Sequence, residues 1–162
     1  MAERRIELSF PDSGVRAVAR LLDEDAPDVC AAMWAALEIP IEDEVTHAQA
    51  SGQEVMLNLP AVNRRFDPTR VPTQNATIHP SPGDILWTYL PPFYMKAYRD
   101  GLWDFIVAYG QCVLTSREVG PLISSRWAHI DDGLEAFAAE CERAFTEGRR
   151  RFRVRRLERL DA

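Results

Sequence analysis

The sequence predicts a mainly β protein in which about eight antiparallel strands form a barrel or a strongly curved sheet capped by two α-helices. Most apolar segments alternate with polar residues at the period of a strand, and short turns containing glycine or proline join them. Only two segments repeat apolar residues at the spacing of a helix. Hairpin-connected strands of this kind close into a barrel or a strongly curved sheet. The 162 residues are enough for one domain with one core.

The N-terminal segment predicts a hairpin followed by a helix. Residues 5–22 alternate around a Pro-Asp-Ser-Gly turn, in which proline presets φ and glycine accepts a positive φ. Pro27 suits the first turn of a helix, where its missing N–H costs nothing, and Pro40 prevents continuation. The helix has one apolar face, which we expect to pack on the sheet: Cys30, Met33, Trp34 and Leu37.

Residues 44–59 predict a second hairpin, which turns at Ser51-Gly52. Val55 and Leu57 point to one side of its second strand, and Glu54 to the other. The stretch from Pro60 to Pro82 has no clean period, which is unusual inside a compact domain. It is interpreted either as a functional loop or as a packed irregular arm or subunit contact.

The second half predicts further strands and one more helix. Residues 85–90 and 102–109 are strongly apolar strands, and 94–98 and 112–115 are candidates for shorter ones. A helix with a regular apolar stripe begins after Asp131 or Asp132 and ends at Gly148. Phe152 and Val154 then alternate with arginines as in a strand.

The net charge of −6 is unevenly distributed along the chain. Residues 149–159 hold seven arginines and one glutamate, so the remainder is strongly acidic. The chain is therefore divided into a barrel domain, 1–148, and a basic C-terminal strand or tail, 149–162, packed on the same domain or on a neighbouring subunit. An acidic body argues against nucleic-acid binding, and no apolar run is long enough to span a membrane.

The start of the chain shows no apolar leader segment, so a cytoplasmic protein is expected. Cys30, Cys112 and Cys141 have no metal-binding or redox spacing and are interpreted as buried reduced thiols. The three histidines have no metal-ligand spacing, and no phosphate-binding loop is present. The sequence therefore predicts neither a metal nor a cofactor.

The order of these elements resembles that of cyclophilins. A hairpin leads to a helix entered at Ala26-Pro27, and the segment from His47 to Met56 keeps the His-to-Gly spacing. The sequence is closer still to uncharacterised bacterial proteins with a cyclophilin-like fold, whose recurring features include Pro80-x-Pro82-Gly83-Asp84-Ile85 and Tyr109-Gly110. The resemblance implies a cyclophilin-like closed barrel. It does not carry over prolyl isomerase activity, because Ala48 stands where that family has its arginine donor.

The candidate site residues come from the same region and from the aromatic strands. His47 and Glu54 are the candidate catalytic pair, because a cross-strand contact between them would allow acid–base chemistry. A histidine hydrogen-bonded within the barrel and a surface ion pair are the alternative interpretations. The residues predicted to bind a ligand at the mouth of a pocket are Gln49, Trp87, Tyr89, Tyr94 and Tyr109, although the aromatic ones also suit a plain core.

Three functions are compatible with the sequence. The first is a protein that binds, and in one version transforms, a small organic molecule in a pocket at the barrel wall. The second is a proline- or peptide-binding relative of cyclophilins, with weak isomerase activity or none. The third is a structural homo-oligomer built through the proline-rich arm and the basic tail.

Overall fold

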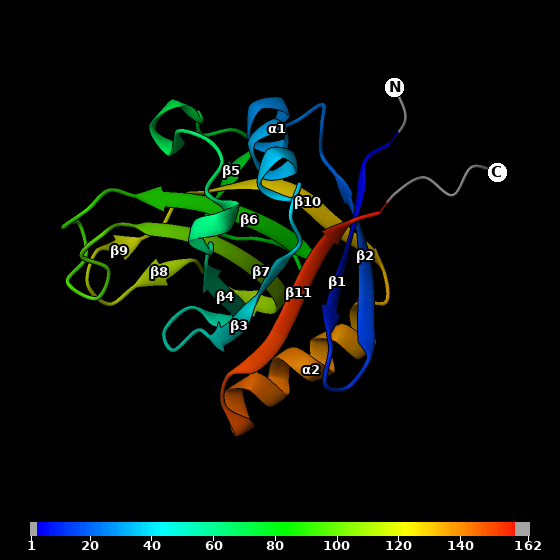
Figure 1. Ribbon diagram of the computed structural model, residues 1–162. Coiled ribbons are helices and arrows are strands. Elements are labelled where there is room, and N and C mark those ends of the chain that lie inside the picture. The colour runs from blue at the N-terminus through cyan, green and yellow to red at the C-terminus, as the bar shows by residue number, and fades with distance from the viewer. Residues whose placement is uncertain (1–2, 158–162) are drawn as a thin grey trace.

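Alternating apolar and polar residues produce eight strands that close into a ring in the computed structural model, which describes residues 3–157 (Figure 1). They are β1 (Arg5–Phe10), β2 (Val15–Leu21), β3 (Ile41–His47), β4 (Gly52–Asn58), β6 (Asp84–Leu90), β7 (Leu102–Cys112), β10 (Ser124–Asp132) and β11 (Arg150–Arg156). The order is β2-β1-β11-β3-β4-β7-β6-β10, and β10 pairs again with β2. All of these pairings are antiparallel. The predicted fold class is confirmed.

Two helices cover opposite ends of the barrel, α1 (Pro27–Ala36) and α2 (Leu134–Glu147) (Figure 1). Each turns an apolar face inward, with Cys30 and Met33 buried on α1 and Phe137 and Cys141 buried on α2. Three very short strands lie outside the ring: β5 (Ala76–Thr77) extends the sheet from β10, and β8 (Thr115–Ser116) pairs with β9 (Gly120–Pro121).

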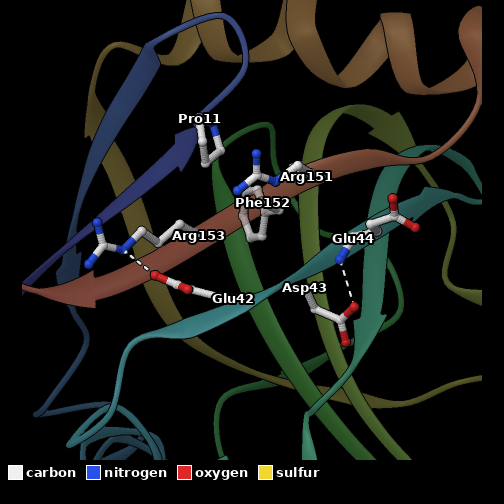
Figure 2. Close-up of a pocket in the computed structure, with 7 residues that line it drawn as sticks. All are labelled: Pro11, Glu42, Asp43, Glu44, Arg151, Phe152 and Arg153. Atoms are coloured by element: carbon white, nitrogen blue, oxygen red, sulfur yellow. Dashed lines mark hydrogen bonds and ion pairs between the residues drawn. The ribbon is translucent and has the colours of Figure 1, made fainter.

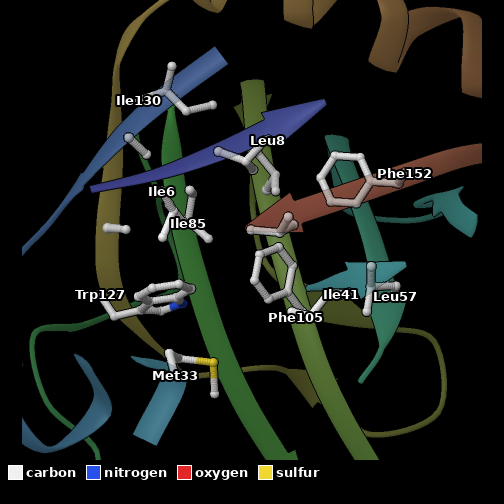
Figure 3. Close-up of a cluster of buried hydrophobic side chains, with 14 of the residues drawn as sticks. Ile6, Leu8, Met33, Ile41, Leu57, Ile85, Phe105, Trp127, Ile130 and Phe152 are labelled. Carbon is white, nitrogen blue, oxygen red and sulfur yellow. The ribbon is translucent and has the colours of Figure 1, made fainter. Parts of the chain in front are cut away.

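The core fills the inside of the ring (Figure 3). Large side chains from strands distant in the sequence meet there, among them Leu8, Phe105, Trp127 and Phe152, which are all at most 1% exposed. The ring of Phe152 lies 5.4 Å from that of Phe10, measured between centroids. The last strand therefore contributes directly to the packing of the first.

The proline-rich segment from residue 60 to 82 is an irregular arm with two single-turn 3₁₀ helices, Ala61–Asn63 and Pro68–Arg70, and the short strand β5. Asn63 is fully buried and ties this arm to the end of α1, because its Nδ2 donates to the carbonyls of Ala36 and Ile39 at 3.0 and 2.8 Å.

Strand β10 differs most from the sequence-based expectation, which had no strand there. Its register with β6 shifts between Arg126 and Ala128, and its register with β2 shifts between Ile130 and Asp132. These bulges break the two-residue period by which a strand is recognised. The expected cap of α2 at Asp131 or Asp132 is also wrong. The helix starts after Gly133 (φ 79°), where a Cβ would meet the Arg16 carbonyl oxygen at 2.6 Å.

Two smaller expectations also fail. Residues 94–98 do not form a strand but a loop with one isolated bridge between Met95 and Tyr98. Strand β7 does not stop at Gly110 but runs on to Cys112, so the expected strand over 112–115 is replaced by the end of β7 and the separate short β8.

Strand β11 lies between β1 and β3, so the basic segment is part of the ring. Its arginines face acidic partners on the neighbouring elements: Arg150 contacts Glu140 and Glu147, Arg151 contacts Asp12, Arg153 contacts Glu42, and Arg155 contacts Glu7. The alternation of arginine with Phe152 and Val154 puts charge outside and apolar groups inside. Residues 158–162 of the predicted tail, 149–162, lie outside the described residues.

Because β11 closes the ring, we expect the removal of a single buried side chain from this strand to destabilise the protein strongly. Replacing Phe152 by alanine removes a buried ring that contacts Phe10, Phe105 and Phe137, and should lower the free energy of unfolding by about 3–5 kcal/mol. Urea denaturation measures it. The neighbouring exposed Arg151→Ala should change stability by less than about 0.5 kcal/mol; equal effects of the two variants would contradict the role assigned to β11.

Candidate functional site

A pocket of about 340 Å³ lies against the outer surface of the barrel wall. Its floor belongs to β4 and β7, and its walls are the loop that follows β6 and the segment around β8 and β9. We call it the outer pocket. Its lining is Ala48, Gln49, Ala50, Ser51, Glu54, Met56, Met95, Ala97, Tyr98, Leu102, Asp104, Ile106, Leu114, Thr115, Ser116, Arg117, Glu118 and Leu122.

The pairing of β4 with β7 determines which side chains reach this pocket. Met56 stands opposite Ile106, and the next outward-facing pair toward one end of the strands is Glu54 with Ala108. Asp104 lies two positions beyond Ile106 in the other direction and faces outward as well. The two carboxyl groups therefore lie on either side of an apolar floor, while the alternate residues of both strands enter the core.

Glu54 is buried in this pocket, with 6% of its surface exposed. The Ser51 hydroxyl donates to its Oε1 at 2.5 Å, and no partner is found for Oε2 within residues 3–157. Burial raises the pKa of the Glu54 carboxyl, and the hydrogen bond from Ser51 offsets part of this rise. Glu54 thus has one buried carboxylate oxygen without a hydrogen-bond partner in the described part of the chain.

Asp104 is still more enclosed, with 3% of its surface exposed. Its Oδ1 has no hydrogen-bond partner in the described part of the chain. Burial, and after it the charge of Glu54, raises the pKa of Asp104 well above the ordinary value. The same Asp104 charge adds to burial in raising the pKa of the Tyr98 hydroxyl, which also lines the pocket.

The absence of partners is specific to this pair. Four acidic residues are buried among residues 3–157: Glu54, Asp84, Asp104 and Glu140. Asp84 accepts from His129 Nδ1 at 2.8 Å and faces Arg126, and Glu140 pairs with two arginines. Buried charges are normally paired in this way because unpaired burial is costly. Glu54 and Asp104 instead line an apolar pocket with one unpartnered oxygen each, and in this position they could hold a polar group or transfer a proton.

The rest of the pocket is largely apolar. A second cluster of buried residues lies on this outer face, separate from the core: Leu86, Ile106, Ala108, Cys112 and Leu114, with Met56 and Leu122 packed against it. The mouth is polar and includes the exposed Arg117 and Glu118, and Glu118 Oε1 accepts from the Lys96 backbone N–H at 2.7 Å. An apolar body with one or two polar groups would match this lining.

The loop that forms one wall contains an unusual backbone. Phe93 has φ 64°, which is rare for a bulky residue, and its ring is 84% exposed. The Phe93 N–H donates to the Arg99 carbonyl at 3.1 Å, which closes the loop on itself. Met95 and Tyr98, which line the pocket, therefore lie on a closed loop.

The predicted pairing of His47 with Glu54 is not formed. His47 stands opposite Val55 in the hairpin, and Glu54 stands opposite Ala48, whose N–H donates to the Glu54 carbonyl at 3.0 Å. Since successive residues of a strand point to opposite faces, the two side chains are on different sides of the wall.

His47 takes part in a different chain of hydrogen bonds, near α2. Its Nε2 is 2.7 Å from the Tyr109 hydroxyl, which donates to Glu142 Oε2 at 2.6 Å. Its Nδ1 is 2.7 Å from the Ala48 carbonyl oxygen, and the Phe145 ring packs on it. This arrangement matches the alternative interpretation of His47 as a histidine hydrogen-bonded within the barrel.

The predicted ligand-binding residues lie in four different places. Gln49 lines the outer pocket, and Tyr109 faces the interior beside His47. Trp87 and Tyr89 pack around Trp103 and lie beside a smaller cavity of about 250 Å³ under the proline-rich arm. Tyr94 is exposed and does not line the outer pocket.

Sequence reasoning missed Asp104 and Tyr98. The signal for Asp104 was present, because it is the one acidic residue in the most apolar strand of the chain. An acidic residue in such a strand must either face the outer surface of the barrel or be buried, and burial of an unpaired carboxylate is costly. Tyr98 lies on the segment 94–98, and of the two tyrosines there only Tyr94 was predicted to bind a ligand.

The remaining nucleophiles and cavities offer less chemistry. Cys30, Cys112 and Cys141 are free and buried, and burial raises the pKa of the Cys30 thiol to about 12, which leaves little thiolate at neutral pH. Among the residues described, no three His, Cys, Asp or Glu side chains are grouped closely enough to hold a metal ion. A cleft of about 500 Å³ crosses β3 and β11 (Figure 2). Its three lining acids are all exposed, and two of them have partners: Glu42 is bound to Arg153, and Asp43 accepts from the Glu44 N–H.

The fold and the outer pocket define a small barrel protein with an acidic, otherwise apolar cavity on its wall. The chain belongs to DUF3830, a family described as proteins of unknown function, whose model matches residues 8–155. The relationship to cyclophilins, which was inferred from the order of motifs, stays a prediction.

Solved structures support the fold. A structure of McbB in complex with tryptophan has a TM-score of 0.65 and 19% sequence identity. The match covers 97% of this chain and 46% of McbB, so this chain spans less than half the length of that protein. The search of curated proteins found no match. Within residues 3–157, neither helix has the length and apolar character needed to span a membrane.

The raised pKa of Asp104 gives a prediction for stability against pH. The folded state retains the Asp104 proton more tightly than the unfolded state, so this group destabilises the native protein as pH rises from about 4 through its raised folded pKa. Asp104→Asn should therefore raise the free energy of unfolding at pH 7 by about 1–3 kcal/mol, with the smallest gain near pH 4. Urea denaturation at several pH values measures the gain. The exposed Asp132→Asn is the control, and a gain from Asp104→Asn that does not vary with pH would contradict the interpretation.

Proposed function

We propose that the protein binds a small organic molecule in the outer pocket and that Glu54 and Asp104 engage its polar part. The observation that carries this proposal is the pair of buried carboxyl groups that line an apolar cavity and that each have one oxygen without a hydrogen-bond partner in the described part of the chain. Such groups reduce the stability of the free protein, and a ligand that supplies partners removes that cost. If the ligand is transformed, the same two groups are the candidates for proton transfer.

The size and chemistry of the cavity support a small molecule rather than an extended peptide. A volume of about 340 Å³ falls at the lower end of the range for ligand pockets. A related argument disfavours a prolyl isomerase. Ala48 lines the same pocket, and the resemblance to cyclophilins puts the arginine donor of that family at this position. Two acidic groups in place of a cationic donor would not stabilise a twisted amide.

The similarity to McbB adds limited support. That protein was captured in complex with tryptophan, so a protein that contains a similar fold binds a small molecule. At 19% identity the comparison carries only the fold, but tryptophan and compounds like it are reasonable first probes.

A fragment screen by NMR tests the proposal. Binding compounds should perturb the methyl signals of the pocket floor and wall, in particular Met56, Ile106 and Leu122. Ala97→Trp, at an exposed wall position, should block the cavity and abolish these shifts without disturbing the core. The same substitution at the exposed Ala139 on α2 should leave binding intact. Compounds that shift only signals elsewhere, or that bind equally well to Ala97→Trp, would refute the proposal.

A further inference from the structure

We infer that the ligand of the outer pocket carries a protonated amine, which the carboxylates of Glu54 and Asp104 bind, and an apolar body that lies on Met56 and Ile106. This inference rests on the proposed function and names the chemical class that the same site selects. It follows from the hydrogen-bonding groups of the pocket, from the charge of its lining residues and from the position of its apolar floor between the two acidic residues.

The deep part of the pocket offers acceptors without matching donors. Glu54 Oε2 and Asp104 Oδ1 are unpartnered, and the Ser51 hydroxyl is already used in its bond to Glu54. On one side of Asp104 stands its cross-strand neighbour Asn58, whose amide oxygen accepts two hydrogen bonds and whose Nδ2 makes no hydrogen bond to Asp104 Oδ1. On the other side, the hydroxyl of Thr88 donates to Ser124. The Tyr98 hydroxyl also lines the pocket but makes no hydrogen bond to either unpartnered oxygen. A ligand that brings donors would therefore suit this site, and an ammonium group brings three.

The charge of the lining favours a cation. Three acidic side chains line the cavity, and the only basic one among the lining residues, Arg117, is exposed at the mouth. Glu54 and Asp104, when ionised, are buried negative charges that an ammonium neutralises through charge-assisted hydrogen bonds. A neutral ligand that only accepts hydrogen bonds would require both carboxyl groups to stay protonated and would gain nothing from their negative charge.

The apolar floor of the pocket determines the kind of carbon skeleton that the ligand should have. Met56 and Ile106 pair across β4 and β7 between the two acidic positions, and Leu114 and Leu122 form an adjacent apolar wall. An amine held at either carboxylate must extend its carbon skeleton across these side chains. Hydrocarbon chains or aromatic rings bury apolar surface there, whereas a small hydrated cation would leave the floor uncovered.

Binding of an ammonium should also release protons. The titratable groups facing the pair are Tyr98 from the loop, Arg117 and Glu118 at the mouth, and Cys112 from β7. Burial raises the pKa of both Tyr98 and Cys112, so neither loses its proton at neutral pH. The proton released on binding must then come from Glu54 or Asp104.

The test uses matched compounds that share one apolar body, for example 2-phenylethylamine and 2-phenylethanol, and cyclohexylmethylamine and cyclohexylmethanol. Each is titrated calorimetrically into the full chain at pH 7 in two buffers of different ionisation enthalpy. The amines should bind at least about tenfold more tightly than the alcohols and release protons. Asp104→Asn and Glu54→Gln should each reduce this preference to less than about threefold, while Glu135→Gln, at an exposed carboxylate on α2, should preserve it. Thermal melting confirms that each variant is folded.

The outcomes separate the inference from the proposed function. Alcohols that bind in the outer pocket as tightly as the amines would overturn the amine assignment and leave the small-molecule pocket standing. An amine preference that persists in both Asp104→Asn and Glu54→Gln would overturn the role of the two carboxylates. If neither the matched compounds nor any member of the fragment screen binds there, both statements fall.

Discussion

The antiparallel pairing of β4 with β7 is the interaction on which the rest of the structure depends. It divides the side chains of two strands between the core and the outer surface in strict alternation. Val55 and Val107 enter the core as a cross-strand pair, and Met56 and Ile106 form the floor of the outer pocket as the next pair. A shift of the register by one residue would bring Glu54 inside the barrel and Val55 outside, which would destroy both the core and the site.

The two faces of the wall formed by β4 and β7 affect the stability of the protein in opposite directions. Its inner face gains from apolar burial, while its outer face holds two acidic groups that lack the partners given to Asp84 and Glu140. Arginines are plentiful in this protein, and β11 shows how readily they find acids on neighbouring strands. The absence of such a partner for Asp104 therefore has a physical cost that a binding role would explain.

Much of the fold could be predicted from local patterns, because alternation and turn residues act over short distances. The first hairpin, both helices and the strand character of Phe152 and Val154 follow from such patterns. Strand β10 could not be recognised, since two bulges interrupt its period. The position of the basic segment in this barrel depends on the pairing of β11 with β1 and β3, which are distant in the sequence, and no local pattern encodes such pairing.

The candidate site was only half predictable for the same reason. Glu54 and Gln49 were identified because their segment resembles a known functional strand, but the partner assigned to Glu54 was wrong. The residue that stands opposite His47 depends on the number of residues in the turn between β3 and β4. One residue more or fewer would change which side chains of β4 share a face with His47. Asp104 comes from a strand distant in the sequence and lies on the same wall as Glu54 only through the pairing of β4 with β7.

Carboxyl-carbon NMR of the full chain, recorded through a pH titration, tests the central claim most directly. The account predicts that the side-chain carboxyls of Glu54 and Asp104 both titrate above the ordinary values of about 4, with Asp104 shifted further. It also predicts that mutating either residue changes the titration of the other. Ordinary, independent titration of both groups would mean that they are solvated and uncoupled, and would contradict the account.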